Sequence, residues 1–377
     1  MAWNAFFRSN IEPVMAYQPG LRTEQIREIA VTDEVHKLSS NESPLPPFPS
    51  ALAAMAEKLV ALNEYPDGSS HDLTQLLAWH YDRTPEQIII GNGSNELLDL
   101  IAETCLQPGD NVVYGWPSFV VYQSSAMIAD AEFRQVPLSS DGSYDLKALL
   151  AAIDERTKIA FICTPNNPTG GVVSQDALKR FLDAVPPHVL VIMDVAYEEF
   201  IDEAQAPDAA KPLAFFDGKR PYVVLKTFSK MYALAGIRCG FGFAPAILVE
   251  MVNKVREPFN VNTVAQVGAI ASLEDAEEIA RRRALNTEGR SRLQACFAEL
   301  GLRSYPSQAN FVWVEVPDAA TSFEALLKRG LIVRPFAGAN GLRITVGDEA
   351  AVTAVIAAFE ELFDWRQEEA RVESWRG

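Results

Sequence analysis

Cysteine is scarce in this chain, whose 377 residues include four, at Cys105, Cys163, Cys239 and Cys296. No two of them form a Cys-x-x-Cys pair, and none has a histidine at a zinc-ligand spacing. The four histidines, His36, His71, His80 and His188, show no metal spacing either. The spacing therefore argues against a zinc site and a disulfide framework, and we expect reduced, mostly buried thiols and no bound metal.

Long hydrophobic runs and an excess of positive charge are also missing. No stretch approaches the roughly 18 apolar residues of a membrane-spanning helix, and Met1–Pro13 soon turns polar, unlike a secretory signal. The formal net charge of −17 would repel a nucleic-acid backbone or an anionic membrane. We therefore expect a soluble, cytoplasmic protein that binds neither, and in which any anionic ligand meets locally positive groups.

The remaining composition is that of a globular protein, with 48% hydrophobic and 22% charged residues. From about Gln87, short β-branched runs alternate with helical patterns such as 95–105 and 175–184. This alternation is typical of βαβ units and a largely parallel sheet. The predicted strands are 87–91, 111–115, 131–138, 158–163, 189–194, 222–226 and 240–244.

After about Val261 the pattern changes, and a long charged helix over 273–300 precedes short strands at 310–316 and 342–347. That order favours a second, α+β domain, in keeping with a chain longer than one core usually organises. We expect an N-terminal arm over 1–40 that joins the small domain, a large domain over 41–262 and a small domain over 263–377. The predicted fold class is α/β, with a mostly parallel seven-stranded sheet covered by helices on both faces.

The segment TFSKMYALAGIRCGFG, Thr227–Gly242, directly follows a predicted buried strand. Open α/β sheets bind ligands at the carboxyl ends of their strands, where Lys230 would lie. Burial lowers the proton affinity of a lysine, as Schiff-base chemistry with an aldehyde cofactor requires. Thr227 and Ser229 supply hydroxyl groups beside it, and Arg238 suits a phosphate dianion. The alternative is that Lys230 is an ordinary loop lysine with solvated neighbours.

Asp194 ends the apolar strand VLVIMD. A carboxylate at the end of a strand that is buried on both faces is costly without a cationic or strongly donating partner. A protonated pyridine nitrogen would serve, and a Schiff-base lysine with such an aspartate is the recognised pattern for pyridoxal phosphate. Tyr197 can aim its hydroxyl at the same ring. Its alternative role is that of a half-buried aromatic at the edge of the sheet.

A third motif, CTPNNPTGG at Cys163–Gly171, also follows a predicted strand. Its prolines and glycines define a tight turn, while Asn166 and Asn167 supply amides that can donate to a phenolate oxygen. The same composition is common in turns that have no further role.

In a fourth motif, IIIGNGSNELLDLI, a strand runs through Gly91 and Gly93 into a helix that starts near Ser94. Free backbone amides and the helix dipole make such a start an anion site, which suits a phosphate. The third glycine of a dinucleotide fingerprint is replaced by Glu96, which weakens a nicotinamide interpretation.

In this order, the four motifs resemble the fold-type I pyridoxal-phosphate-dependent aminotransferases, and especially the histidinol-phosphate aminotransferase branch, over nearly the whole chain. The resemblance implies that Lys230 carries pyridoxal 5'-phosphate as a Schiff base and that Asp194 keeps its ring nitrogen protonated. It also implies that Phe119 stacks on the ring, while Asn167 and Tyr197 donate to the phenolic oxygen. The phosphate contacts that it implies are Gly93, Ser94, Asn95, Thr227, Ser229, Arg238 and, from the second subunit of a homodimer, Tyr65.

On the substrate side, the resemblance assigns Arg343 in GLRITVG to the α-carboxylate of an amino acid. The resemblance also implies that the substrate is bound by Arg334, by Asn41 in LSSNESP and by Tyr17 in the N-terminal arm. The reaction that it implies is transamination from histidinol phosphate, the amino donor, to the 2-oxo acid 2-oxoglutarate in histidine biosynthesis. Histidinol phosphate has no α-carboxylate, so Arg343 and Arg334 would then receive its phosphate.

Two departures bear on this assignment. The chain has Asp-Val-Ala-Tyr where relatives usually have Asp-Glu-Ala-Tyr, so Val195 replaces an acidic residue. The compact stretch Arg334–Gly347 resembles the aromatic-amino-acid aminotransferases of the same branch as much as it resembles the histidinol-phosphate enzymes. Transamination of aromatic amino acids is therefore the alternative activity. More distant alternatives are a phosphate-ester decarboxylase of the same fold, a nicotinamide oxidoreductase and a non-catalytic anion-binding protein.

Overall fold

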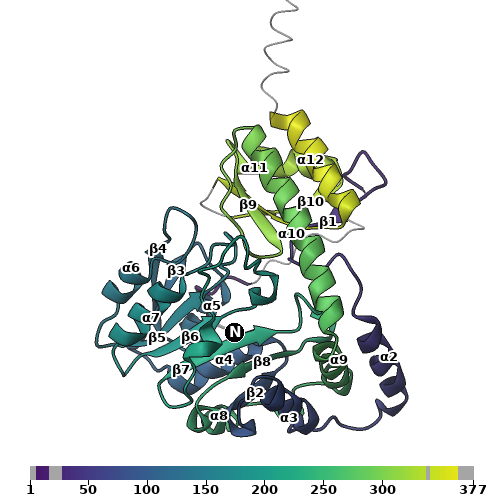
Figure 1. Ribbon diagram of the computed structural model, residues 1–377. Coiled ribbons are helices and arrows are strands. Elements are labelled where there is room, and N and C mark those ends of the chain that lie inside the picture. Colours follow the sequence, from purple (N-terminus) through teal and green to yellow (C-terminus); the bar gives the residue numbers. More distant parts are fainter. Residues whose placement is uncertain (1–5, 17–27, 337–339, 364–377) are drawn as a thin grey trace, which may run out of the picture.

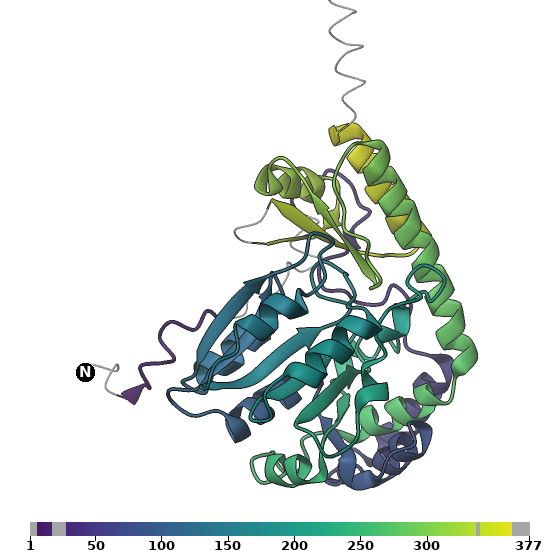
Figure 2. The same ribbon diagram turned by 60° about the vertical axis from the view of Figure 1, so that its left-hand side comes forward.

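A computed structural model describes residues 6–16, 28–336 and 340–363 of the chain. It consists of a larger body built on one wide sheet and a smaller body above it (Figure 1). The long helix α10, Ala276–Glu299, runs along both bodies, which is clearest at the right-hand edge of Figure 2. Along the part of the chain that is described, no helix is both long and apolar enough to cross a membrane.

The wide sheet has seven strands in the order β2-β8-β7-β6-β5-β3-β4. Each strand expected there is confirmed, with ends that differ by no more than one residue, as is the predicted α/β fold class. Only β8 is antiparallel to its neighbours, β7 and β2, so β2 runs in the same direction as β7. The strands are β2 Ile88–Gly91, β3 Asn111–Trp116, β4 Glu132–Pro137, β5 Thr157–Cys163, β6 Leu190–Asp194, β7 Tyr222–Thr227 and β8 Gly240–Phe243.

Helices pack against both faces of this sheet (Figures 1 and 2). Helix α7 illustrates why they form where they do: Ser174 caps its first turn by accepting from the amide of Ala177, and Leu178, Phe181 and Leu182 face the core. The helices of this body are α2 Pro49–Lys58, α3 His71–His80, α4 Ser94–Cys105, α5 Val121–Ile128, α6 Leu146–Ala151, α7 Gln175–Ala184, α8 Ala246–Val252 and α9 Thr263–Leu273.

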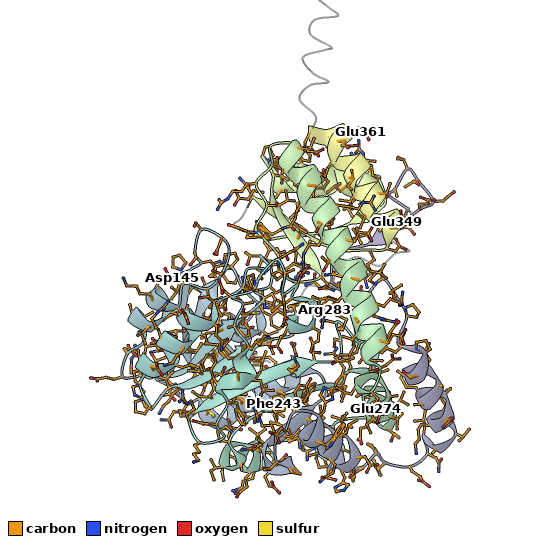
Figure 3. The ribbon with its side chains drawn as sticks, viewed as in Figure 1. Asp145, Phe243, Glu274, Arg283, Glu349 and Glu361 are labelled. Carbon is orange, nitrogen blue, oxygen red and sulfur yellow. The ribbon has the colours of Figure 1, made fainter. Side chains whose placement is uncertain are left out.

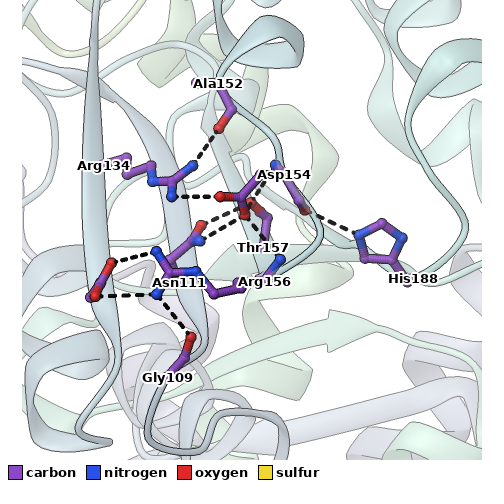
Figure 4. A network of polar contacts seen from close by, with 9 residues as sticks. Gly109, Asn111, Arg134, Ala152, Asp154, Arg156, Thr157 and His188 are labelled. Carbon is purple, nitrogen blue, oxygen red and sulfur yellow. Dashed lines mark hydrogen bonds and ion pairs between the residues drawn. The ribbon is translucent and has the colours of Figure 1, made fainter.

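Asp154 ties together the amino-terminal edge of the sheet, where β3 and β5 begin (Figure 4). Its carboxylate accepts from Asn111 Nδ2 at 2.9 Å and from Arg134 Nη2 at 2.6 Å, and Thr157 Oγ1 donates to Asn111 at 2.8 Å. The hydrogen bond from Asn111, helped by Arg134, holds the pKa of Asp154 well below its usual range. This network ties the start of β3 to the turn that precedes β5, at the point where the pairing of the two strands shifts register.

The smaller body contains a three-stranded antiparallel sheet in the order β11-β12-β9 and a separate parallel pair formed by β1 and β10. The helix expected over 273–300 begins later, at Ala276, because Leu273 still belongs to α9 and Asp275 caps α10 by accepting from Glu278 N. The elements of this body are β1 His36–Lys37, β9 Phe311–Glu315, β10 Leu331–Ile332, β11 Arg334–Pro335, β12 Gly341–Thr345, α11 Ala319–Lys328 and α12 Glu349–Phe363.

Two main apolar clusters underlie the two bodies. The larger one includes Ala265, Ala269 and Leu273 of α9, whereas the smaller one takes its first α10 residue at Leu293. The apolar residues of α9 therefore lie in the larger cluster, where α9 packs against α2, and the domain boundary at residue 262 stays a prediction. Leu38 of the N-terminal segment belongs to the smaller cluster.

We predict that Leu293→Ala destabilises the protein by about 2–5 kcal/mol, because Leu293 is fully buried in the smaller cluster and its truncation leaves a cavity. Leu285→Ala on the same helix is the matched control, since Leu285 is 47% exposed and its truncation should change stability by less than about 0.5 kcal/mol. Urea unfolding followed by circular dichroism measures both. Equal destabilisation by the two variants would contradict the assigned packing of α10.

Candidate active site

The four motifs singled out in the sequence meet at the carboxyl edge of the wide sheet. Asn167 follows β5, Asp194 ends β6, Lys230 follows β7 and Gly93 follows β2. They share one edge because the single reversed strand, β8, leaves β2 and β7 pointing the same way. Lys230 Nζ lies 5.8 Å from the centre of the Tyr197 ring, so the predicted catalytic groups are gathered at one place.

Lys230 is a half-buried lysine close to two other positively charged side chains. Burial, followed by the nearby guanidinium groups of Arg343 and Arg238, lowers its pKa to about 8, and the attraction of Asp194 only partly opposes this. Its Nζ donates to the carbonyl oxygen of Ser40 at 3.3 Å. A lysine with such a pKa is neutral in a substantial fraction of molecules near pH 8 and can therefore attack a carbonyl carbon.

Asp194 is buried at the end of β6, with both carboxylate oxygens engaged. One accepts from the Tyr122 hydroxyl at 2.7 Å and the other from the amide of Ala196 at 3.2 Å. Burial raises the pKa of Asp194, and the hydrogen bond from Tyr122 and the charge of Lys230 act against that rise. A carboxylate that is desolvated to this degree favours a cationic N–H donor as a further partner.

Tyr122 is a functional residue that the sequence motifs do not reveal. Its ring stacks on Phe161 at a centroid distance of 4.7 Å, which fixes the hydroxyl against Asp194. The available signal was its position three residues after Phe119, inside the same helix-starting segment. Phe119 itself lies edge-on to Tyr122, with ring centroids 5.8 Å apart, and so borders the same site.

Tyr197, Asn41 and Asn167 form the polar wall of the site. Asn41 Nδ2 donates to the Tyr197 hydroxyl at 2.9 Å, and burial raises the pKa of Tyr197, which keeps that hydroxyl protonated. Asn167 accepts from Arg343 Nη1 through its side-chain oxygen. No described residue accepts from its NH2 group, which is therefore suited to donate to a phenolic oxygen of a ligand.

The start of α4 forms a cradle for an anion. Gly93 caps the helix with φ +87°, and a Cβ placed there would lie 2.4 Å from Arg238 Nη2, so only glycine lets this guanidinium approach the helix start. Ser94 and Asn95 are the first residues of the helix. Their amides, the helix dipole and Arg238 together favour a phosphate group.

The turn after β7 completes this cradle. Thr227 of β7 and Gly91 of β2 are both register partners of Gly240, where a Cβ would lie 2.3 Å from the amide nitrogen of Ser94. Thr227 Oγ1 accepts from the amide of Ser229, and Ser229 Oγ accepts from Arg238 Nη1 at 3.5 Å. The structure thus places six of the seven predicted phosphate contacts, all except Tyr65, around the ends of β2, β7 and β8.

Arg343 and Arg334 lie opposite each other in the antiparallel pair β11–β12, which places both side chains on the same face of the small sheet. Arg343 donates to Asn167 and to the carbonyl oxygen of Ser39, a contact that the sequence does not reveal. Its guanidinium also lies 5.5 Å from the centre of the Phe311 ring. Two guanidinium groups on one face suit an anionic substrate group.

Two predicted residues remain outside this cluster. Tyr65 is 82% exposed and stacks on Phe259 at 4.8 Å, so its hydroxyl projects from the surface of the chain. Tyr17 lies outside the described residues, and its predicted substrate contact stays a prediction.

The side chains that are present fit pyridoxal phosphate. They comprise a nucleophilic amine at Lys230, a buried carboxylate at Asp194 for the ring nitrogen, donors for the phenolic oxygen and an anion cradle at Gly93 that a Cβ would fill. Each part of the cofactor therefore meets a group of matching chemistry.

Comparisons with known proteins agree with this geometry. The family model for aminotransferase class I and II matches residues 33–359. The chain is 40% identical over 361 residues to histidinol-phosphate aminotransferase of Moorella thermoacetica, covering 94% of this chain and 92% of that protein. It is also 41% identical over 366 residues to histidinol-phosphate aminotransferase of Methylobacillus flagellatus, covering 96% of this chain and 98% of that protein. A crystal structure of histidinol-phosphate aminotransferase from Sinorhizobium meliloti in complex with pyridoxal-5'-phosphate superposes with a TM-score of 0.86 at 27% identity, covering 95% and 97% of the two chains.

The lowered pKa of Lys230 predicts a pH-dependent cost of folding in the cofactor-free protein. An unfolded chain holds the Lys230 proton up to about pH 10.5, whereas the folded chain releases it near pH 8. The cost is therefore complete below pH 8, on the order of 3 kcal/mol, and disappears as the pH rises from 8 to 10.5. Lys230→Met should stabilise the cofactor-free protein at pH 7, and this advantage should largely vanish at pH 10.

Urea unfolding at the two pH values measures this difference. Lys147→Met is the control, because Lys147 is exposed and its replacement should leave the stability difference between pH 7 and pH 10 unchanged. An advantage of Lys230→Met that is the same at both pH values would show that the burial of charge is not its cause.

Proposed function

Because this chain belongs to the class I and II aminotransferases, we propose that it transfers the amino group of histidinol phosphate to 2-oxoglutarate. It is an enzyme, and its cofactor is pyridoxal phosphate. The observation that carries the proposal is the meeting of a buried amine of lowered pKa, Lys230, with the buried carboxylate Asp194 at one edge of the sheet. The curated relatives at about 40% identity support the choice of substrate.

When bound, pyridoxal phosphate supplies an aldehyde carbon that bonds to amines and a protonated ring that withdraws electrons from the substrate α-carbon. Lys230 Nζ would hold the aldehyde carbon, and Asp194 would keep a proton on the ring nitrogen. Asn167 and Tyr197 would donate to the phenolic oxygen. Arg238 and the amides of α4 would neutralise the phosphate and fix the ring relative to the sheet.

Lys230 has a second task once an amino substrate has displaced it. Its neutral amine would take the proton from the substrate α-carbon and would give it to the former aldehyde carbon of the cofactor, on the far side of the substrate nitrogen; a pKa of about 8 suits an amine that both accepts and donates a proton near neutral pH. The carbonyl oxygen of Ser40 accepts from Nζ and orients the amine between these positions.

Arg334 and Arg343 support a phosphate-bearing substrate over an aromatic amino acid. Their side chains share one face of the small sheet, and two positively charged guanidinium groups match the double negative charge of a phosphate better than the single charge of an α-carboxylate. The phosphate of histidinol phosphate would meet both, while the α-carboxylate of 2-oxoglutarate would meet Arg343 in the second half of the reaction. Asn41, hydrogen-bonded to Tyr197, lies next to this position.

We also propose a homodimer that works in the cytoplasm. The 82% exposure of Tyr65 supports the dimer, because a phosphate-binding tyrosine that projects from the surface can serve the site of a second subunit. All four cysteines are free thiols, in keeping with a reducing compartment.

We predict that Lys230→Ala abolishes covalent capture of the cofactor and lowers turnover by several orders of magnitude, because no other amine takes its place. Borohydride reduction of the loaded protein followed by peptide mass spectrometry should show the added mass on Lys230 alone. Lys254→Ala, at an exposed lysine, is the matched control and should behave like the wild type. Labelling of another lysine in the wild type, or normal turnover by Lys230→Ala, would refute the assignment.

The substrate is tested by following single amino-donor half-reactions with histidinol phosphate, phenylalanine, tyrosine and leucine. The wild type should prefer histidinol phosphate, and Arg334→Gln should lower kcat/KM for that substrate by about 10- to 100-fold, the loss expected when one charged hydrogen bond is removed. The amino acids, which lack a phosphate, should be affected less.

Arg329→Gln is the control for this series, because Arg329 pairs with Glu361 away from the site. A wild-type preference for phenylalanine or tyrosine would instead establish the aromatic-amino-acid activity.

A further inference from the structure

Lys226 is a buried cation that the proposed reaction does not use. It lies on β7 and is 4% exposed. Its neighbour Leu225 is the register partner of Asp194, and successive residues of a strand point to opposite faces of the sheet. Lys226 therefore points to the face opposite Asp194, and its charge needs a partner there.

Two carboxylates supply that partner and form, with Lys226, the Lys226 cluster. Lys226 Nζ lies 2.5 Å from Glu198 Oε2 and 2.8 Å from Glu199 Oε1. Burial disfavours the charged form of Lys226, but the attraction of both carboxylates outweighs it and places the pKa of Lys226 well above its usual value. Burial also raises the pKa values of the neighbouring Tyr81 and Tyr232, so these phenols add no charge. Because pulling the cluster apart would leave buried charges without partners, it restricts where the two carboxylates can lie.

The two carboxylates belong to the turn that follows Tyr197. This single turn of 3-10 helix, η4, spans Glu198–Phe200. It is closed by a hydrogen bond from the Phe200 amide to the Tyr197 carbonyl oxygen at 3.1 Å, and the Glu198 amide donates to the carbonyl oxygen of Val195 at 3.0 Å. The position of η4 thus sets the backbone from which the Tyr197 side chain projects.

Helix α10 contacts the same turn from a second element. Arg283 Nε donates to the carbonyl oxygen of Glu199 at 2.6 Å, and Arg290 Nη1 donates to that of Phe200 at 3.5 Å. Figure 3 labels Arg283 on the part of α10 that lies beside the larger body. Strand β7 therefore holds the side chains of η4, and α10 holds its carbonyl groups.

We propose that Lys226 and Arg283 are positioning residues, which hold η4 in place and thereby aim the Tyr197 hydroxyl at the phenolic oxygen of the cofactor. The hydrogen bond from Asn41 and the edge-on ring of Phe311 restrain the Tyr197 side chain, whereas η4 sets the backbone that carries it. This inference rests on the proposed contact between Tyr197 and the phenolic oxygen and does not depend on the identity of the amino donor.

The colour of the bound cofactor provides the test. Pyridoxal phosphate joined to a lysine absorbs visible light, and its spectrum changes at the pH where the bound group loses its proton. A hydrogen bond from Tyr197 stabilises the ionised phenolic oxygen, so its loss should move this pH upward. Tyr197→Phe, the reference variant, should raise the midpoint by at least about 1 pH unit.

The Lys226 cluster is opened by combining Lys226→Met with Glu199→Gln. This change leaves Glu198, whose side chain is 25% exposed and can reach water, so no charge is trapped. It should raise the midpoint by at least about 0.5 pH unit. Adding Tyr197→Phe should give the midpoint of Tyr197→Phe alone, because both changes act through the same hydroxyl.

Arg283→Met is the second variant. It leaves no buried charge behind, since Arg283 is half-buried and donates to a neutral carbonyl group. It should move the midpoint in the same direction by at least about 0.3 pH unit.

The matched control removes an ion pair of similar burial on α10. Arg282→Met with Glu278→Gln breaks a pair whose side chains are 5% and 14% exposed, against 5% and 11% for Lys226 and Glu199. A further hydrogen bond of Arg282 goes to the carbonyl oxygen of Pro46 and not to η4. This control should lower stability against urea, as the cluster variant does, and leave the midpoint within about 0.2 pH unit of the wild type.

A control that shifts the midpoint as far as the cluster variant overturns the proposal, as does an unchanged midpoint in both the cluster variant and Arg283→Met. A further upward shift when the cluster variant is combined with Tyr197→Phe also overturns it. An unchanged midpoint in Tyr197→Phe itself refutes the contact with the phenolic oxygen and this role with it, whereas the amino donor is decided separately by the half-reactions.

Discussion

The structure depends on the burial of one amine and one carboxylate at the same edge of a sheet. Asp194 is 4% exposed and Lys230 is half-buried, and the pKa of each is shifted toward the neutral form by this burial. Neither shift is relieved by a direct ion pair between the two side chains. Both groups are thereby kept available for a ligand that offers an aldehyde carbon at one end and a cationic ring nitrogen at the other.

The edge itself results from sheet topology. The strands that carry Asn167, Asp194 and Lys230 are parallel neighbours, and the reversal of β8 returns β2 and its anion cradle to the same side. At the other edge, Asp154 holds the strand starts of β3 and β5 together. The amino-terminal edge of the sheet thus serves as a rigid scaffold that positions the polar loops at the carboxyl edge. Open α/β sheets usually bind their ligands at such loops.

Arg343 joins the two bodies at the site. It belongs to the small sheet, yet it donates to Asn167 after β5 and to Ser39 of the N-terminal segment. If the substrate anion binds Arg343 as proposed, it would compete for these same donors, and its binding would be coupled to the relative position of the two bodies. Asn310 extends the connection, because it donates to Asn41, the hydrogen-bond partner of Tyr197.

The sequence alone determined the seven strands, the lysine, the aspartate and the glycine cradle, because each depends on a local pattern: an apolar run, a turn motif or a residue at a strand end. It also suggested Arg334 and Arg343 through family resemblance. Tertiary structure alone decided that Tyr122 holds Asp194, that Ser39 and Ser40 accept from Arg343 and Lys230, and that α9 belongs to the larger core. These contacts join residues far apart in the chain, and no local spacing encodes which of many tyrosines or carbonyl groups will be the partner.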